Sequence, residues 1–469
     1  MKVSTFSKIA IFYRLIVDAL NGDHKEFTSG SINKALFMLS VPMIMEMVME
    51  SVFAVVDVFF VGRISVNAVA TVGLTESVLM LIYSISIGLS IAATALVSRR
   101  VGEKNNEEAI NSATQAVFLT GILSVLLAIP GIIYAKDILR IMGGSEELVA
   151  SGYNYARIML GGNVTIMFLF LFNGIFRGAG DASISMKALW IANLVNIILD
   201  PVFIFGFKFI PGFGLDGAAI ATNIGRGVAV VYQIFMITKG NSIIKIKIRN
   251  FRINFAIMVN MIKISLGGTS QFLIESASWI FLVRILSTFG SDVLAGYTIA
   301  LRIVVFTILP SMGLSNAAAT LVGQNLGAKE YDRAEQSVWK AAFYNMIFLG
   351  CVSVVFIFFA EQLIGIFSSD PIVIENGKMC LQILCIGYVF FAYGMVLTQS
   401  FNGAGDTRTP TFINLFCHWV FQIPFAYFLS IFLKMGPKGT FIAVAAAFSL
   451  QAFISMYLFK KGKWKSTMV

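Results

Sequence analysis

Residues 35–62 read ALFMLSVPMIMEMVMESVFAVVDVFFVG. All of the charged residues in this run are acids, namely Glu46, Glu50 and Asp57. An α-helix of this length extends over about 42 Å, which exceeds the hydrocarbon thickness of a bilayer, about 30 Å. The segment therefore predicts a membrane-spanning helix that carries carboxylates.

Apolar segments of similar length follow along the whole chain of 469 residues. Hydrophobic residues make up 57% of the sequence and charged residues 13%, which is about half of the charged share of soluble domains. This composition excludes a soluble enzyme, a disordered protein and a nucleic-acid-binding module. Twelve membrane spans are predicted, at residues 35–62, 68–97, 112–135, 156–177, 187–206, 216–238, 264–288, 294–321, 338–360, 379–401, 410–433 and 438–459.

The net charge of +10 is explained by membrane topology. With both termini in the cytoplasm, most of the 35 Lys and Arg residues fall in inner tails and loops, as the positive-inside rule requires. The loop after the sixth span is the richest in basic residues, and we expect it to contact anionic membrane lipids. The sequence thus predicts a multi-pass protein of the inner (cytoplasmic) membrane.

Two motifs recur at one constant spacing along the chain. Residues 97–109 share Val, Gly, Lys and Ala with residues 322–334, and the Phe-x-Gly-Ala-Gly-Asp motif of residues 176–181 returns at residues 401–406. The spacing is 225 residues in both cases. Six predicted spans, an even number, separate equivalent points, so the two halves insert in the same orientation, related by a pseudo-twofold axis along the membrane normal.

The sequence therefore predicts an all-α polytopic membrane protein with two six-helix lobes. The expected units are a cytoplasmic amphipathic N-terminal segment (1–34), an N-lobe (35–239), a basic cytoplasmic linker (240–263), a C-lobe (264–460) and a cytoplasmic tail (461–469). Such two-lobed bundles are typical of alternating-access transporters, with a substrate pathway between the lobes. A duplicated scaffold without a pathway is the alternative.

The acids of the first span form one narrow stripe. At about 100° per residue, Glu46, Glu50 and Asp57 lie within about 40° of one another around the helix. An acid inside a membrane is costly unless it faces a cavity or a partner, and like charges this close resist simultaneous ionisation. The stripe therefore favours binding of a proton or a metal cation, although a structural role in bonding neighbouring helices is the alternative.

Two further in-span acids are candidates for function. Asp200 follows Asn196 by one helical turn and precedes Pro201, which leaves a backbone carbonyl without its helical partner. This donor set suits a hard cation or a proton relay, whereas a helix terminus without a ligand is the alternative. Glu275 lies near the middle of the seventh span, 225 residues after Glu50, so each lobe carries a carboxylate at the equivalent depth.

The sequence contains no feature typical of an enzyme or a primary pump. It lacks a G-x4-G-K-[ST] phosphate-binding loop, and its two histidines and scattered acids assemble neither a catalytic triad nor a metal cluster. We expect no catalysis, no cofactor and no nucleic-acid partner.

The chain contains five motifs whose order along the sequence resembles that of the multidrug and toxic compound extrusion (MATE) family of transporters. This family belongs to the flippase superfamily for multidrug, oligosaccharidyl-lipid and polysaccharide export. The five motifs are Pro42 through Asp57-Val58-Phe59-Phe60-Val61-Gly62, Phe176-Arg177-Gly178-Ala179-Gly180-Asp181, Asn196-x3-Asp200-Pro201, Gly323-Gln324-x2-Gly327-Ala328-Lys329, and Asn402-Gly403-Ala404-Gly405-Asp406-Thr407-Arg408.

The resemblance implies a V-shaped prokaryotic exporter of organic cations that exchanges them for H⁺ or Na⁺. Because both lobes of the pathway belong to one chain, we expect the protein to work as a monomer. Relatives of the damage-inducible branch imply a cation or proton site in the N-lobe, formed here by Asp57, Asn173, Asn196, Asp200 and Thr222. A sodium ion would be held by Asp57, Asn196 and Asp200.

The chain also resembles the sodium-coupled exporter branch. Glu275 matches the seventh-helix glutamate of that branch, but no acid between Lys378 and Gly405 matches its tenth-helix aspartate. Glu46 and Glu50 have no counterpart in either branch and are assigned only as cavity carboxylates together with Glu275.

Two other functions stay open from the sequence. A lipid-linked oligosaccharide flippase of the same superfamily would need cationic cavity residues for the pyrophosphate, and the candidates are Arg157, Arg226, Arg284 and Arg302. A membrane scaffold or receptor without transport would leave the in-span acids without effect on mutation.

Overall fold

The computed structural model describes residues 5–22, 26–247 and 252–469. Side chains at positions 5–12, 54, 55, 57, 58 and 66 lie outside this description. Within the described residues the regular structure is helical, apart from one isolated bridge between Phe207 and Ile210. The predicted all-α fold is therefore confirmed.

The first half of the chain forms nine helices in the described part. They are α1 (Thr5–Asn21), α2 (Ile32–Val61), α3 (Val66–Gly102), α4 (Asn106–Ile133), α5 (Ala135–Ile141), α6 (Glu146–Gly161), α7 (Asn163–Ala179), α8 (Ala182–Phe205) and α9 (Leu215–Thr238).

The second half begins with the long helices α10 and α11. Its α-helices are α10 (Phe255–Ser287), α11 (Ser291–Gly327), α12 (Tyr331–Gly365), α13 (Pro371–Ile386), α14 (Tyr388–Gly403), α15 (Arg408–Asn414), α16 (Ile423–Tyr427) and α17 (Pro437–Lys460). Two π-helical stretches, Leu415–Gln422 and Phe428–Phe432, continue α15 and α16, and a 3₁₀ turn, Lys463–Ser466, follows α17.

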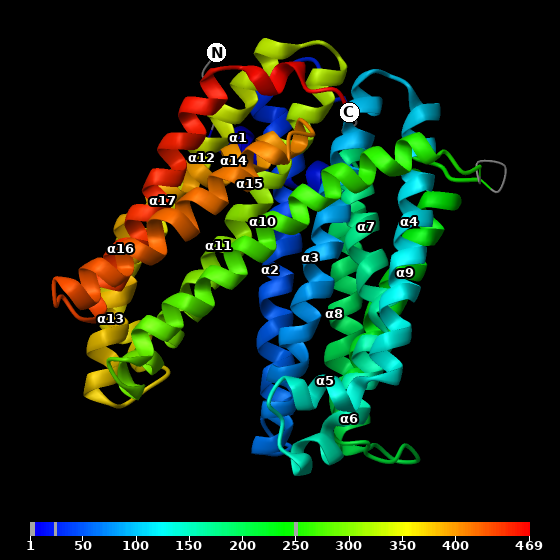
Figure 1. Ribbon diagram of the computed structural model, residues 1–469. Helices are drawn as coiled ribbons and strands as arrows, with labels where there is room; N and C mark the ends of the chain where they lie inside the picture. Colours follow the sequence, from blue (N-terminus) through cyan, green and yellow to red (C-terminus); the bar gives the residue numbers. More distant parts are fainter. Residues whose placement is uncertain (1–4, 23–25, 248–251) are drawn as a thin grey trace.

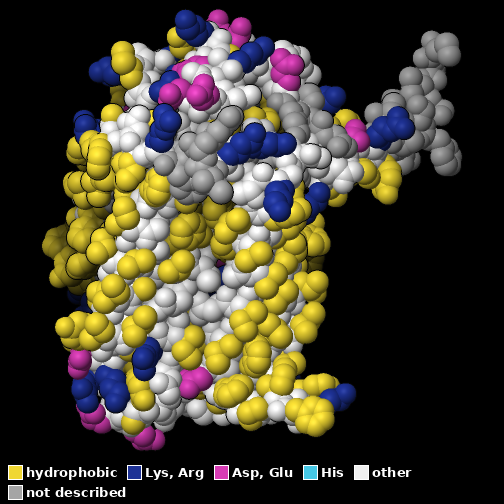
Figure 2. All heavy atoms as spheres, turned by 90° about the vertical axis from the view of Figure 1, so that its right-hand side faces the viewer, with side chains coloured by type: hydrophobic (Ala, Val, Ile, Leu, Met, Phe, Trp, Pro, Cys, Tyr) yellow, Lys and Arg dark blue, Asp and Glu magenta, His cyan; other side chains and the backbone are white. Residues whose placement is uncertain are grey.

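These helices supply the membrane spans that the hydropathy predicts. Eleven spans in the described residues are long and apolar enough to cross a bilayer, and the bent pair α13 and α14, which meet at 58°, makes a twelfth. On the face shown in Figure 2, hydrophobic side chains cover the middle of the surface, while Lys, Arg, Asp and Glu gather toward its two ends. The chain is thus a multi-pass membrane protein.

The sequence repeat is also a repeat of backbone conformation. Gly180 and Gly405 end their helices with φ of +87° and +85°, the left-handed region that favours glycine. Lys104 and Lys329 adopt φ of +57° and +62° after α3 and α11. The repeated residues therefore mark the same helix ends in each half.

The two halves form the arms of a V (Figure 1). The arms meet at the end of the molecule that holds both termini and diverge toward the opposite end. The first half of α2 packs against the second half of the chain, because Leu39 and Met43 share a buried cluster with Leu321 of α11. The contact is close, since a Cβ on Gly313 would lie 2.6 Å from the Ile44 nitrogen.

Helix starts explain where the structure departs from the predicted spans. Asn254 caps α10 by accepting hydrogen bonds from the Ala256 and Ile257 amides, so this helix includes the last nine residues of the segment predicted as a linker. Ser145 caps α6, which begins ten residues before the predicted fourth span and gives way to α7 at Gly162.

Candidate functional site: a cavity between the lobes

A cavity of about 440 Å³ lies between the two arms. Its walls come from α2, α3, α7, α8 and α9 on one side and from α10, α11, α14, α15 and α17 on the other. Apolar and aromatic side chains dominate the walls, including Phe53, Tyr83, Phe170, Phe272 and Phe391. A cavity of this size and character fits a drug-sized organic molecule.

The charged residues that line the cavity are few. Three are the acids Glu46, Glu50 and Glu275, all of which the sequence assigns to a cavity. Two are arginines, Arg177 and Arg226, and both belong to the N-lobe wall. On the C-lobe wall, Glu275 is the charged residue among the described lining residues, so that wall carries a net negative charge.

The polar pair predicted in the fifth span lies together on α8 and reaches α9. The Asn196 amide Nδ2 donates to Asp200 Oδ1 at 3.1 Å and to Thr222 Oγ1 at 3.3 Å. All three side chains are buried, and those of Asn196 and Thr222 also line the cavity. The helix continues past Pro201 to Phe205, so this is not a helix terminus.

The other two residues of the predicted N-lobe site, Asp57 and Asn173, are not seen to join this cluster among the described residues. Asp57 lies on α2, and its side chain is outside the described residues. Asn173 of α7 donates from Nδ2 to Glu46 Oε1 at 3.0 Å and accepts from Gln233 Nε2 at 2.6 Å. Its side-chain hydrogen bonds thus join it to Glu46 and α9, and its backbone carbonyl accepts from the Ser185 hydroxyl on α8 at 3.3 Å.

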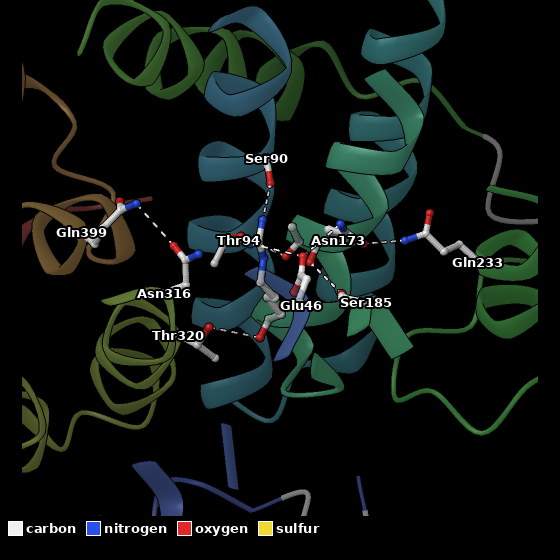
Figure 3. A network of polar contacts seen from close by, with 11 residues as sticks. Glu46, Ser90, Thr94, Asn173, Ser185, Gln233, Asn316, Thr320 and Gln399 are labelled. Atoms are coloured by element: carbon white, nitrogen blue, oxygen red, sulfur yellow. Dashed lines mark hydrogen bonds and ion pairs between the residues drawn. The ribbon is translucent and has the colours of Figure 1, made fainter. Parts of the chain in front are cut away.

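Glu46 of α2 belongs to a polar network that joins helices of both lobes (Figure 3). Besides the bond from Asn173, its Oε1 lies 3.7 Å from Arg177 Nη1. Arg177 in turn donates to the Ser90 hydroxyl on α3 at 3.0 Å, and its backbone carbonyl accepts from Thr320 on α11 at 3.2 Å. The network therefore connects an acid of the N-lobe with the C-lobe.

Glu50 has its own cation on the same wall. The charge of Arg226 on α9 acts on the Glu50 carboxylate. Arg226 is held in place by the Tyr83 hydroxyl, to which it donates at 3.1 Å, and by the ring of Phe53, 5.7 Å from its guanidinium carbon. Arginine charges on the N-lobe wall thus act on both of its glutamates, Arg177 at ion-pair distance from Glu46 and Arg226 on Glu50.

Glu275 differs from Glu46, which lies 3.7 Å from Arg177. Its backbone carbonyl accepts from the Ser278 hydroxyl, and no ion pair to its carboxylate occurs among the described residues. The side chain is half-buried. A cation inside the cavity would therefore meet an uncompensated negative charge on the C-lobe wall.

The sequence reasoning did not single out Arg177 or Gln233 as site residues. A signal existed for Arg177, since it stands inside the repeated motif at residues 176–181. Its contact with Glu46 joins helices that are far apart in the sequence, which periodicity within one helix does not reveal. Gln233 carries no comparable sequence signal.

Among the described residues, no group of three or more His, Cys, Asp and Glu side chains is placed to hold a metal ion. The sodium site predicted at Asp57, Asn196 and Asp200 includes a side chain outside the description, so it stays a prediction. Of the four arginines that a flippase reading would use, Arg226 lines the cavity, whereas Arg157, Arg284 and Arg302 are exposed and do not.

A cavity enclosed by two repeated six-helix lobes defines the class of the protein as a two-lobed membrane transporter. The family model MatE matches residues 42–202 and 269–428, one match in each lobe. The chain belongs to the MatE family, which confirms the resemblance seen in its motifs.

Named relatives and a solved structure agree with this assignment. The chain is 25% identical to the probable multidrug resistance protein YoeA of Bacillus subtilis over 94% of this chain and 96% of that protein. It is 26% identical to the probable multidrug resistance protein NorM of Thermotoga maritima, over 93% and 94%. A multidrug resistance MATE family transporter in an outward-facing conformation matches with a TM-score of 0.89 and 26% identity, over 94% of this chain and 99% of that chain.

Proposed function

We propose that this chain exports organic cations across the cytoplasmic membrane in exchange for H⁺ or Na⁺. The observation that carries the proposal is the cavity between the lobes, whose apolar and aromatic walls hold three carboxylates. Apolar and aromatic walls bind the hydrophobic parts of varied substrates, and the carboxylates favour substrates that carry a positive charge. The names of the relatives, multidrug resistance proteins, support the same substrate class.

The V shape supports alternating access as the mechanism. With both termini in the cytoplasm, as the distribution of basic residues indicates, the arms meet at the cytoplasmic end and the structure is outward-facing (Figure 1). Rocking of one lobe against the other would expose the cavity to the cytoplasm. One chain should suffice, because both walls belong to it.

Ion coupling is assigned to the N-lobe. Asp200, together with Asn196 and Thr222, offers a buried carboxylate with oriented amide and hydroxyl groups. A proton or sodium ion loaded here from the outside changes the free-energy difference between the outward-facing and inward-facing states. Coupling requires only that the ion and the substrate bind one state with different affinities.

The test is efflux of a fluorescent organic cation from proteoliposomes under an imposed proton gradient or sodium gradient. We expect one of the gradients to drive efflux, and Asp57→Asn and Asp200→Asn to abolish this dependence. Glu361→Gln serves as the control, because Glu361 pairs with Lys378 on the exposed surface outside the cavity. Wild-type rates in both aspartate variants would overturn the N-lobe mechanism.

A further inference from the structure

The pseudo-twofold repeat places two different residue pairs at one equivalent position. Glu46 and Arg177 of the N-lobe correspond, at the spacing of 225 residues, to Gln271 and Asn402 of the C-lobe. In the C-lobe the two amides bond reciprocally, with Gln271 Nε2 donating to Asn402 Oδ1 at 3.0 Å and Asn402 Nδ2 donating to Gln271 Oε1 at 3.1 Å. The same position is therefore charged in one lobe and neutral in the other.

The carboxylate of Glu46 is nearly closed off from solvent and incompletely satisfied. Its residue is 1% exposed, and Oε1 receives the bond from Asn173. Oε2 is buried and has no hydrogen-bond partner among the described residues. A buried carboxylate oxygen without a donor is costly to keep charged, and a proton on that oxygen removes this cost.

The charged surroundings of Glu46 are simple. Arg177 from α7 and Glu50 from α2 itself are the charged groups that act on it. The helices α8 and α11, which also pack on α2, contribute neutral groups nearby: Trp190 donates to the Met45 carbonyl, and Gly313 lies against Ile44. The charge of Glu46 is thus balanced chiefly by Arg177.

Arg177 lies at the seam between the lobes, where α3 and α7 of the N-lobe meet α11 and α14 of the C-lobe. Besides the main cavity, it lines a small pocket of about 30 Å³ whose other walls include Asn316, Gln399 and Asn402 of the C-lobe. Those amides already bond to one another, since Gln399 donates to Asn316 at 3.3 Å and Asn402 donates to Gln399 at 2.8 Å. These amides are neutral, so Glu46 is the residue that compensates the charge of Arg177 at this seam.

We propose that Glu46 and Arg177 form a proton-operated charge switch of the transport cycle, an inference that rests on the proposed export function. A proton from the cavity binds Glu46 Oε2 and neutralises the carboxylate. Arg177 then remains as an uncompensated charge, mostly buried, in the closed seam. This charge repels a cationic substrate from the cavity and destabilises the lobe contact, because hydration of the guanidinium requires the seam to open.

A proton fits this position better than a sodium ion does. A sodium ion at Glu46 would stand beside the positive charge of Arg177, whereas a proton adds no separate cation to the pocket. Release of the proton to the cytoplasm restores the ion pair and with it the seam. The neutral pair of Gln271 and Asn402 cannot respond in this way, so the switch belongs to the N-lobe alone.

The test uses the C-lobe pair as a built-in reference. The double variant Glu46→Gln with Arg177→Asn gives the N-lobe the amide pair that the C-lobe already accommodates. The single variant Glu46→Gln mimics the protonated acid and keeps the arginine. Spin labels on Phe209→Cys and Ser369→Cys, in the α8–α9 and α12–α13 loops at the open ends of the two arms, measure the separation of the lobes in a background without the four native cysteines.

We expect acidification to shift the wild-type protein from the long to the short label separation. Glu46→Gln should favour the short separation at every pH, with the population ratio changed at least tenfold. In a background with Asp57→Asn and Asp200→Asn, which removes the carboxylates proposed for ion coupling, the double variant should restore the long separation and lose the pH response. A Glu46→Gln protein with the wild-type ratio and pH response, or a double variant that keeps the pH response in that background, would overturn the switch.

Two further outcomes separate the possible failures. A ratio that follows sodium concentration and ignores pH in the wild-type protein would overturn the assignment of a proton. The label separation is measured on purified protein without substrate, so its pH response tests the switch independently of export. An absence of cation export in proteoliposomes would contradict the proposed function only.

Discussion

Glu50 of α2 and Glu275 of α10 occupy equivalent positions of the two lobes and line the same cavity, and the positive charge of Arg226 acts on Glu50. The two equivalent carboxylates should therefore differ in how strongly they attract a cation in the cavity. A cationic substrate should interact more strongly with the acid that has no arginine beside it.

We predict that Glu275→Gln weakens the binding of an organic cation about tenfold, equivalent to ~1.4 kcal/mol, while Glu50→Gln weakens it less. The physical reason is that no arginine lines the C-lobe wall beside Glu275 among the described residues, whereas the positive charge of Arg226 acts on Glu50 and offsets part of its attraction for a cation. Fluorescence titration of the purified protein with a cationic dye measures both dissociation constants. Equal effects of the two substitutions would show that the arginine does not shield Glu50.

The buried cluster on α8 and α9 should contribute to stability as well as to coupling. Asn196→Ala removes the amide that donates to Asp200 and Thr222. Loss of a donor to a buried carboxylate costs about 1–3 kcal/mol, so the variant should unfold at a lower temperature in detergent. Asn376→Ala is the matched control, since Asn376 is half-buried and its amide makes an exposed hydrogen bond to a backbone carbonyl within its own helix. Equal melting temperatures for the two variants would contradict this role of Asn196.

The lobe contact at Gly313 should tolerate no side chain. Gly313→Ala places a methyl group 2.6 Å from the Ile44 nitrogen, so α11 must move away from α2. We expect a loss of stability of about 1–3 kcal/mol and slower export. Gly350→Ala on α12 is the control, because a Cβ there meets nothing within 4 Å. Thermal unfolding that affects both variants alike would argue against a tight contact at Gly313.

The end of α3 should hold the closed end of the V together. Arg99 donates to the carbonyls of Ala404 at 3.3 Å and Thr467 at 3.0 Å, both from the C-lobe half of the chain. Arg99→Ala should therefore raise the population of the inward-facing state, measured with the same pair of spin labels. Arg140→Ala removes an exposed arginine whose partners, Asp137 and Glu146, lie in its own half of the chain, and should leave that population unchanged. An unchanged population in Arg99→Ala would contradict the proposed closing role.

The length of the apolar runs allowed the helical spans to be predicted, because in a membrane each run must satisfy its backbone hydrogen bonds within one helix. Boundaries were less predictable where polar caps decide them. Ser145 begins α6 ahead of the apolar region, and the 58° bend between α13 and α14 lies at Gly387, inside one continuous apolar run. Hydropathy registers neither feature.

The site could be predicted only as far as single helices determine it. The spacing of Glu46 and Glu50 on one helix face indicated that both acids face the same way, and both line the cavity. The partners Arg177 and Arg226 come from other helices, and which acid each one meets depends on how the helices pack. The bond from Asn173 to Glu46 follows from the same packing.

Exchange of a cationic substrate for an ion is the central claim, and reciprocal flow tests it most directly. An outward gradient of the organic cation, imposed on proteoliposomes without any ion gradient, should drive protons or sodium ions inward. Dyes for internal pH and for sodium then report which ion moves. We predict an ion influx that stops when Asp200 is replaced by Asn; substrate export with no movement of either ion would contradict the account.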